Sequence, residues 1–198
     1  TFHCWKEKGH GVMSLKNAMK QSCDTYFYEI ARLLGVDRLK ITAEKFGLGE
    51  KVLGAYFKNE KKGLFPNTSW KKNNLGKGWV LGETLITGIG QGYTQTTPLQ
   101  LCLMTAQIAN GGYSIKPRIV VNNNPMSLEE AKNKLKEETL HGQEKKLFKD
   151  HKNIKIVQEA MFSSTNELYG TSYKSRIDNP KYQFAGKTGT AQVKRISM

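Results

Sequence analysis

The sequence predicts a helix-rich α+β fold, and three observations support this prediction. Apolar residues recur with helical spacing over 24–34 and 37–46. A third helical stretch with its own capping signal lies at 97–110. Near the C-terminus, bulky side chains alternate over 182–185, a pattern typical of a strand. Hydrophobic residues make up 38% of the 198-residue chain, so it can form a real core as one domain or a large piece of one.

The N-terminal part is expected to form three consecutive helices, the first a short one over residues 14–21. Asp24 is placed to cap the second helix, and Gly35 to end it. Asp37 is placed to cap the third, and Gly47 to end it. Their inward residues are expected to be Phe27, Ile30, Ala31 and Leu34, then Leu39, Ala43 and Phe46.

Residues 50–80 are rich in Lys, Asn and Gly and are expected to form an exposed excursion. The composition of the chain changes after this excursion. Residues 84–115 contain no charged side chain, although 24% of the chain is charged. Thr97 and Gln100 form a capping box for a helix that ends at Gly111. Apolar residues occupy nearly all faces of this helix, so we expect it to be buried.

Two neighbouring stretches complete the organisation. Gly88, Gly90 and Gly92 imply tight backbone or close approach of another group. Residues 113–121 are predicted to enter a strand, and the charge-dense residues 122–153 to form a solvated insertion or surface helix.

The net charge is +14, from 31 Lys and Arg against 17 Asp and Glu. This favours anionic partners such as nucleic acid, acidic lipid or an anionic polymer, but a lysine-rich composition gives the same charge without any partner. Cys4, Cys23 and Cys102 are odd in number and form no C-x-x-C, which argues against a disulfide framework and a structural zinc site. We therefore predict no metal and no cofactor.

The stretch AGKTGTAQV contains Gly186-Lys187-Thr188, which matches the end of a phosphate-binding loop. The first glycine of such a loop is replaced by Lys181, and Tyr182 and Phe184 suit a strand instead. The nucleotide-binding interpretation is therefore rejected.

The same lysine also begins Lys187-Thr188-Gly189. On a strand, Lys187 and Gly189 would share one face and Thr188 would take the other. Lys187 would then supply positive charge and hydrogen bonds in a cleft. Gly189 would let a substrate lie along the strand edge, and the backbone N–H of Thr190 would serve as an oxyanion donor.

A second motif, Ser22-Cys23-Asp24, lies between two predicted helices. Ser22 would relay a proton while Asp24 holds the relay by hydrogen bonds. Asp24 as a plain helix cap is the alternative, and both roles are compatible. Together with Lys187-Thr188-Gly189, this motif supplies two of the three elements of a serine acyltransferase set, S-x-x-K, S-x-N/D and K-T-G. We therefore expect Ser22 and Lys187 to face each other across one groove, although they are far apart in the sequence.

Three blocks stand in a fixed order, namely QSCDTYFYEIARLLGVDRL, then GIGQGYTQTTPLQL with AQIANGG, then AGKTGTAQV. In this order the chain resembles the transpeptidase domain of class B penicillin-binding proteins, most closely the penicillin-binding protein 2 branch of rod-shaped Gram-negative bacteria. The resemblance covers nearly the whole chain and is poorest over 122–165. Residues 1–198 are thus expected to be the central portion of such a domain, truncated at both ends.

The resemblance implies a β-lactamase/transpeptidase-like fold, an antiparallel sheet flanked by helices. It implies a serine-type D-Ala-D-Ala transpeptidase that cross-links peptidoglycan stem peptides and is acylated by β-lactams. It assigns Ser22, Asp24 and Lys187 to catalysis, and Thr188, Gly189 and Thr190 to substrate binding. It implies no cofactor, partnership with a membrane glycan polymerase and an elongation-complex scaffold, and a place on the periplasmic face of the bacterial inner membrane, with the anchor outside this chain.

The resemblance also shows what is missing, because the family's S-x-x-K nucleophile block should lie upstream of Ser22 and does not occur there. Residues 69–72 match S-x-x-K, which we interpret as a chance match, and residues 164–166 match S-x-N, which we interpret as a chance match or a turn. No apolar run is long enough to span a bilayer. We expect the chain by itself to lack a nucleophile and transpeptidase activity.

Two other hypotheses remain open. A penicillin-recognising sensor module of the same fold would carry the same motifs. A basic nucleic-acid-binding protein is suggested by charge alone, but the basic residues are spread out and form no single stripe, so we predict no nucleic-acid partner.

Overall fold

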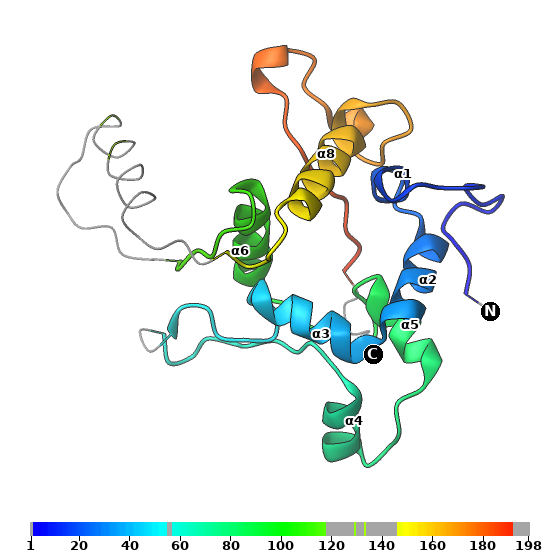
Figure 1. Cartoon of the computed structure of the whole chain (residues 1–198), viewed down its shortest axis with the longest axis vertical. Helices are drawn as coiled ribbons and strands as arrows, with labels where there is room; N and C mark the ends of the chain where they lie inside the picture. Colours follow the sequence, from blue (N-terminus) through cyan, green and yellow to red (C-terminus); the bar gives the residue numbers. More distant parts are fainter. Residues whose placement is uncertain (1, 55–56, 118–128, 130–132, 134–145, 192–198) are drawn as a thin grey trace, which may run out of the picture.

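The computed structural model describes residues 2–54, 57–117, 129, 133 and 146–191. Helices dominate this part of the chain (Figure 1). They are α1 (Leu15–Lys20), α2 (Asp24–Leu34), α3 (Val36–Lys45), α4 (Thr68–Leu75), α5 (Leu81–Gly88), α6 (Pro98–Ala109) and α8 (Lys152–Asn166), with 3-10 helices η2 (Tyr173–Ser175) and η3 (Pro180–Tyr182).

Two pairs of helices form the frame, with α2 packed on α5 and α1 packed on α8 (Figure 1). The α2–α5 contact is close because α5 ends in Gly88, where an added Cβ would lie 2.4 Å from the Cβ of Ala31. In the loop that follows, Gly90 and Gly92 both have φ of 76°, which favours glycine. The predicted reasons for glycine here, close approach and tight backbone, are both confirmed.

The three N-terminal helices are confirmed, but two of their predicted caps are wrong. The Ser14 hydroxyl caps α1 by accepting a hydrogen bond from the N–H of Asn17. Helix α2 begins at Asp24 itself. Helix α3 follows Gly35 directly, so Asp37 lies inside its first turn. The Asp37 carboxylate is therefore free to accept hydrogen bonds from the backbone N–H and hydroxyl of Thr68 at the start of α4.

Helix α6 forms with its predicted capping box, but the prediction that it is buried on nearly all faces is wrong. It buries the face that carries Gln100, Leu103 and Gln107, while Leu101 is 44% exposed. Burial depends on the neighbouring elements, and the helix that packs on α6 is α8. The Nε2 of Gln100 donates to the carbonyl oxygens of Glu50 at 2.7 Å and Lys62 at 2.8 Å, so this face also anchors the segment between α3 and α4.

The predicted excursion over 50–80 is mostly exposed, yet it contains α4 and one buried lysine. Lys71 is 5% exposed and forms an ion pair with Glu83 of α5. Burial alone would raise the pKa of Glu83, but hydrogen bonds from Lys71 and from the N–H of Val80 outweigh burial and lower it. This ion pair fixes α4 against the first turn of α5.

No sheet forms within the described residues, where β structure is limited to two isolated bridges, Leu64 with Gln95 and Tyr113 with Lys146. The predicted strand entry begins at Tyr113 and continues outside the described residues, as does most of the predicted insertion over 122–153. The strand predicted at 182–190 is not formed: Tyr182 ends η3, and residues 183–191 have no regular structure. A strand needs a hydrogen-bonded neighbour, and in this part of the structure the segment lies against a helix instead.

Candidate active site

Ser22 lies at the junction of α1 and α2 with a φ of 51°, in the left-handed region that non-glycine residues rarely adopt. The indole of Trp5 holds this junction by donating from Nε1 to the carbonyl oxygens of Ser22 at 2.9 Å and Gln21 at 3.2 Å. A backbone held in this region commonly occurs where a side chain must take one fixed direction.

Residues 183–191 follow η3 and run alongside α8, the reddest part of the ribbon in Figure 1. The N–H of Gly186 donates to the carbonyl oxygen of Met161 at 3.1 Å. The side chain of Asn166 donates to the carbonyl oxygen of Phe184 at 2.9 Å. Helix α8 therefore sets the position of this segment directly before Lys187.

The junction held by Trp5 and the segment held by α8 bring Ser22 and Lys187 into contact. The Nζ of Lys187 donates to the Oγ of Ser22 at 2.7 Å, and also to the carbonyl oxygen of Thr188 at 2.9 Å. The predicted proximity of the two motifs, which are 165 residues apart, is confirmed.

Thr188 lies on the same side as Lys187, because its Oγ1 is 3.3 Å from the Oγ of Ser22. The prediction that Thr188 faces away from Lys187 is wrong, since alternation of side chains requires a regular strand. Gly189 and Thr190 are exposed, and an added Cβ at Gly189 would meet open space. The structure thus gathers Ser22, Lys187 and Thr188, and leaves the next two residues facing solvent.

Asp24 supports Ser22 indirectly. Its Oδ2 accepts a hydrogen bond at 3.0 Å from the backbone N–H of Trp5, the residue whose indole holds the Ser22 carbonyl. Neither the predicted cap nor a direct hydrogen bond to the Ser22 hydroxyl accounts for Asp24 here, because the carboxylate at the first position of α2 points toward the N-terminal segment.

The charge of Lys187 is modulated by its surroundings. Partial burial of the ammonium group lowers the pKa of Lys187, and the negative charge of Asp24 raises it by a smaller amount. Asp24 therefore favours the protonated form of Lys187, which is the form that donates to Ser22.

Thr171 belongs to this cluster although sequence analysis did not identify it. Its Oγ1 lies 3.3 Å from the Oγ of Ser22 and accepts from the Oγ1 of Thr188 at 3.0 Å. The only local signal is the preceding Gly170, and a single glycine before a threonine is too common to indicate a site.

Cys4, His10 and Cys23 place their sulfur and nitrogen atoms within 4.8 Å of one another, the one such group of possible metal ligands found in the described residues. Thiolate and imidazole are ligands that suit Zn²⁺. Burial, followed by the charge of Lys6, lowers the pKa of His10, while Asp24 opposes this shift. The spacing of the cysteines along the chain gave no sign of this group, because its three residues come together only when the chain folds.

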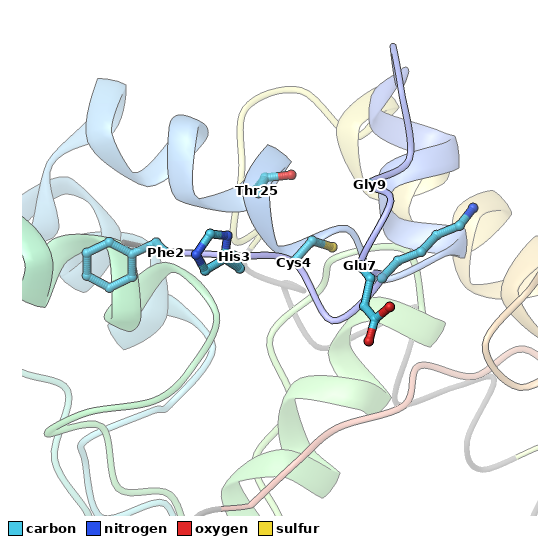
Figure 2. Close-up of a pocket in the computed structure, with 7 residues that line it drawn as sticks. Phe2, His3, Cys4, Glu7, Gly9 and Thr25 are labelled. Carbon is cyan, nitrogen blue, oxygen red and sulfur yellow. The ribbon is translucent and has the colours of Figure 1, made fainter.

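A cavity of about 410 Å³ opens beside this group, between the N-terminal segment and the start of α2 (Figure 2). Its lining consists of Phe2, His3, Cys4, Lys6, Glu7, Gly9 and Thr25. Most of these residues come from the N-terminal segment, and Thr25 comes from α2.

The two further motif matches lie differently with respect to the gathered residues. Ser69 and Lys72 are exposed on α4, which lies at the far end of the molecule from α1 (Figure 1). Ser164 and Thr165 are buried within α8, so the second match is part of a helix and not a turn. The Oγ of Ser164 nevertheless lies 3.2 Å from the Oγ1 of Thr171 in the cluster. No helix in the described residues has the length and apolarity to cross a membrane.

Comparison with known proteins gives one consistent match. The family model described as penicillin binding protein transpeptidase domain matches residues 1–196. The peptidoglycan D,D-transpeptidase MrdA of Acinetobacter baumannii is 35% identical over 207 residues, which cover 99% of this chain and 28% of that protein. The chain therefore spans less than a third of the length of this curated relative.

Solved structures agree in fold. The Helicobacter pylori penicillin-binding protein PBP2, in a complex with MreC, superposes with a TM-score of 0.79 at 33% identity, covering 97% of this chain and 33% of that one. The Pseudomonas aeruginosa PBP2 in complex with WCK 5153 gives 0.77 at 36% identity, covering 96% of this chain and 41% of that one. The chain has the penicillin-binding transpeptidase fold, and it belongs to the penicillin-binding protein transpeptidase domain family.

Proposed function

We propose that this chain is the central part of a peptidoglycan D,D-transpeptidase of the penicillin-binding protein 2 type, and that its two motifs form one side of the active site. The observation that supports this most strongly is the 2.7 Å hydrogen bond from Lys187 to Ser22. In the parent protein, meaning the longer protein that contains this chain, further strands complete the antiparallel sheet expected beside residues 183–191.

The proposed roles follow from chemistry. Ser22 relays a proton to the leaving amine, because its hydroxyl can both donate and accept. Lys187 supplies fixed positive charge at the Ser22 oxygen, and Asp24 favours that charge. Thr188 binds the substrate together with Gly189, where open space leaves room for a peptide backbone. The N–H of Thr190 donates to the oxyanion.

The proposed substrate is the D-Ala-D-Ala end of a stem peptide. A serine outside these 198 residues attacks the amide carbonyl, and D-Ala leaves with the proton from Ser22. An amine on a neighbouring peptidoglycan strand then takes the acyl group. β-Lactams acylate the same serine. We place the parent protein on the periplasmic face of the inner membrane, with a membrane glycan polymerase and an elongation scaffold as partners. The H. pylori relative solved with MreC supports the scaffold part of this proposal.

Fluorescent penicillin tests the proposal. It is expected to label the full-length parent at a serine of an S-x-x-K block encoded about 40–70 residues before Thr1, the distance expected for this motif set. The isolated 198-residue chain is expected to remain unlabelled. A parent that lacks the block would contradict the proposal, and stable labelling of the isolated chain would show that the nucleophile lies within it. A labelled parent that cross-links no stem peptides in a reconstituted assay would favour the sensor hypothesis.

A further inference from the structure

Thr171 occupies the point where three segments of the proposed active site meet. Its Oγ1 accepts from Thr188 at 3.0 Å and lies 3.3 Å from the Oγ of Ser22 and 3.2 Å from the Oγ of Ser164. A threonine hydroxyl offers one donor and two acceptor sites, so Thr171 can accept from Thr188 and at the same time donate to one of the two serines.

The backbone around Thr171 is fixed from two sides. Its N–H donates to the carbonyl oxygen of Lys20 at 3.1 Å, at the end of α1, and the N–H of Ser172 donates to the carbonyl oxygen of Ser164 at 3.0 Å. Gly170 allows this approach, because an added Cβ there would lie 2.2 Å from the same Ser164 oxygen. The Thr171 hydroxyl is thus held by the helix pair α1–α8 and not by its own loop alone.

The hydroxyl groups form a continuous chain with one consistent direction. Lys187 donates to Ser22, and Thr188 donates to Thr171. If Ser22 donates to Thr188 and Thr171 donates to Ser164, every one of these contacts is satisfied at distances of 2.7–3.3 Å. Ser164 is fully buried, so the far end of this chain is shielded from water.

We propose that Thr171 is a positioning residue that fixes the orientation of the Ser22 hydroxyl, with Ser164 as its support on α8. This inference rests on the function proposed above. In this proposal Thr171 acts through its neighbours and not on the substrate. It acts by holding Thr188, and through it Ser22, in the direction that leaves the Ser22 oxygen facing Lys187. Loss of the Thr171 hydroxyl would let Ser22 rotate away from this direction.

The test measures the second-order rate of acylation by fluorescent penicillin in the full-length parent. Thr171→Val keeps the shape of the side chain and removes the hydroxyl, Thr171→Ala removes more, and Thr171→Ser keeps the hydroxyl. We expect at least a tenfold slower acylation for Val and Ala, and a rate within threefold of the unsubstituted protein for Ser. Thr105→Val is the control, because the Thr105 hydroxyl bonds only the carbonyl of Leu101 in its own helix.

Each outcome is decisive. Acylation of Thr171→Val or Thr171→Ala at the unsubstituted rate overturns the inference, as does an equal loss in Thr171→Ser, because the hydroxyl would then not be the operative group. If neither Val nor Ala folds, Ser164→Ala decides: we expect about threefold slower acylation, and an unchanged rate overturns the inference. A parent that is not labelled at all overturns the proposed function itself, which distinguishes the two failures.

Discussion

The ammonium group of Lys187 donates a 2.7 Å hydrogen bond to the hydroxyl of Ser22, although 165 residues separate them in the chain. Two independent supports produce this contact. Trp5 holds the left-handed backbone of Ser22 through its carbonyl, and α8 holds the segment before Lys187. The contact is therefore a product of tertiary packing, and its removal has predictable consequences for reactivity.

Removing the lysine charge should slow acylation. Lys187→Ala in the parent is expected to lower the rate of acylation by a β-lactam at least about tenfold, because a charged donor to the Ser22 hydroxyl contributes more than roughly 1.4 kcal/mol. Lys181→Ala is the matched control, since Lys181 is an exposed lysine of η3 in the same stretch of chain. Equal rates for the two variants, measured with fluorescent penicillin, would refute the role given to Lys187.

Asp24→Asn should change the pH dependence of acylation. The substitution removes the negative charge that raises the pKa of Lys187, while the asparagine oxygen can still accept from the N–H of Trp5. The pKa of Lys187 should therefore fall further, and the alkaline limb of the acylation–pH profile should move to lower pH. Asp37→Asn, which alters a contact to Thr68 instead, should leave the limb in place. An alkaline limb that moves equally in both variants, or in neither, speaks against the coupling of Asp24 to Lys187.

The ion pair between Glu167 and Lys20 should contribute to stability in a pH window set by the carboxylate. Hydrogen bonds from Lys20 and then Ser163 lower the pKa of Glu167 below its usual 4.5 in the folded protein. Its contribution is thus present above pH 4.5 and is lost as the pH falls through the lowered pKa. Glu167→Gln should cost about 1 kcal/mol at pH 7, a modest value because the Glu167 side chain is 43% exposed and solvent screens the pair.

Thermal unfolding of the parent at pH 7 and at pH 3 measures this effect. Glu29→Gln is the matched control, because Glu29 also forms an ion pair, with Arg32, but on an exposed helix surface. We expect an unchanged melting temperature for the control at both pH values. A Glu167→Gln variant whose loss of stability is as large at pH 3 as at pH 7 would show that the carboxylate charge is not responsible.

Two glycines should respond to alanine in opposite ways. Gly170→Ala is expected to destabilise the protein by about 2 kcal/mol, since its Cβ would lie 2.2 Å from a backbone oxygen of Ser164. Gly189→Ala should leave the melting temperature unchanged, because open space surrounds the position, yet it should slow acylation by obstructing the substrate. A stable Gly170→Ala variant, or normal acylation by Gly189→Ala, would contradict the respective assignment.

Sequence reasoning succeeded where the signal is local or where motif order constrains space. The capping box of Thr97 and Gln100, the helix end at Gly35 and the proximity of Ser22 to Lys187 were all predictable and are confirmed. The roles of those site residues stay predictions. The first residues of helices were harder to predict. Asp24 and Asp37 have side chains suited to capping, but they lie one and two residues after the actual N-cap positions.

The rest depended on contacts that no local pattern encodes. Thr171 joins the cluster because α1 packs on α8, and Cys4, His10 and Cys23 meet because the N-terminal segment folds back on α2. The exposure of Leu101 reflects which neighbours α6 has and not its own composition.

A double-mutant cycle on Ser22 and Lys187 tests most directly whether the two residues act together. Acylation rates of the parent are compared for Ser22→Ala, Lys187→Ala and the double variant. The hydrogen bond between them predicts a coupling energy of at least about 1.5 kcal/mol, so that the double variant reacts about as fast as the slower single variant. Rate losses that simply multiply would show that Ser22 and Lys187 act independently, and would contradict a shared active site.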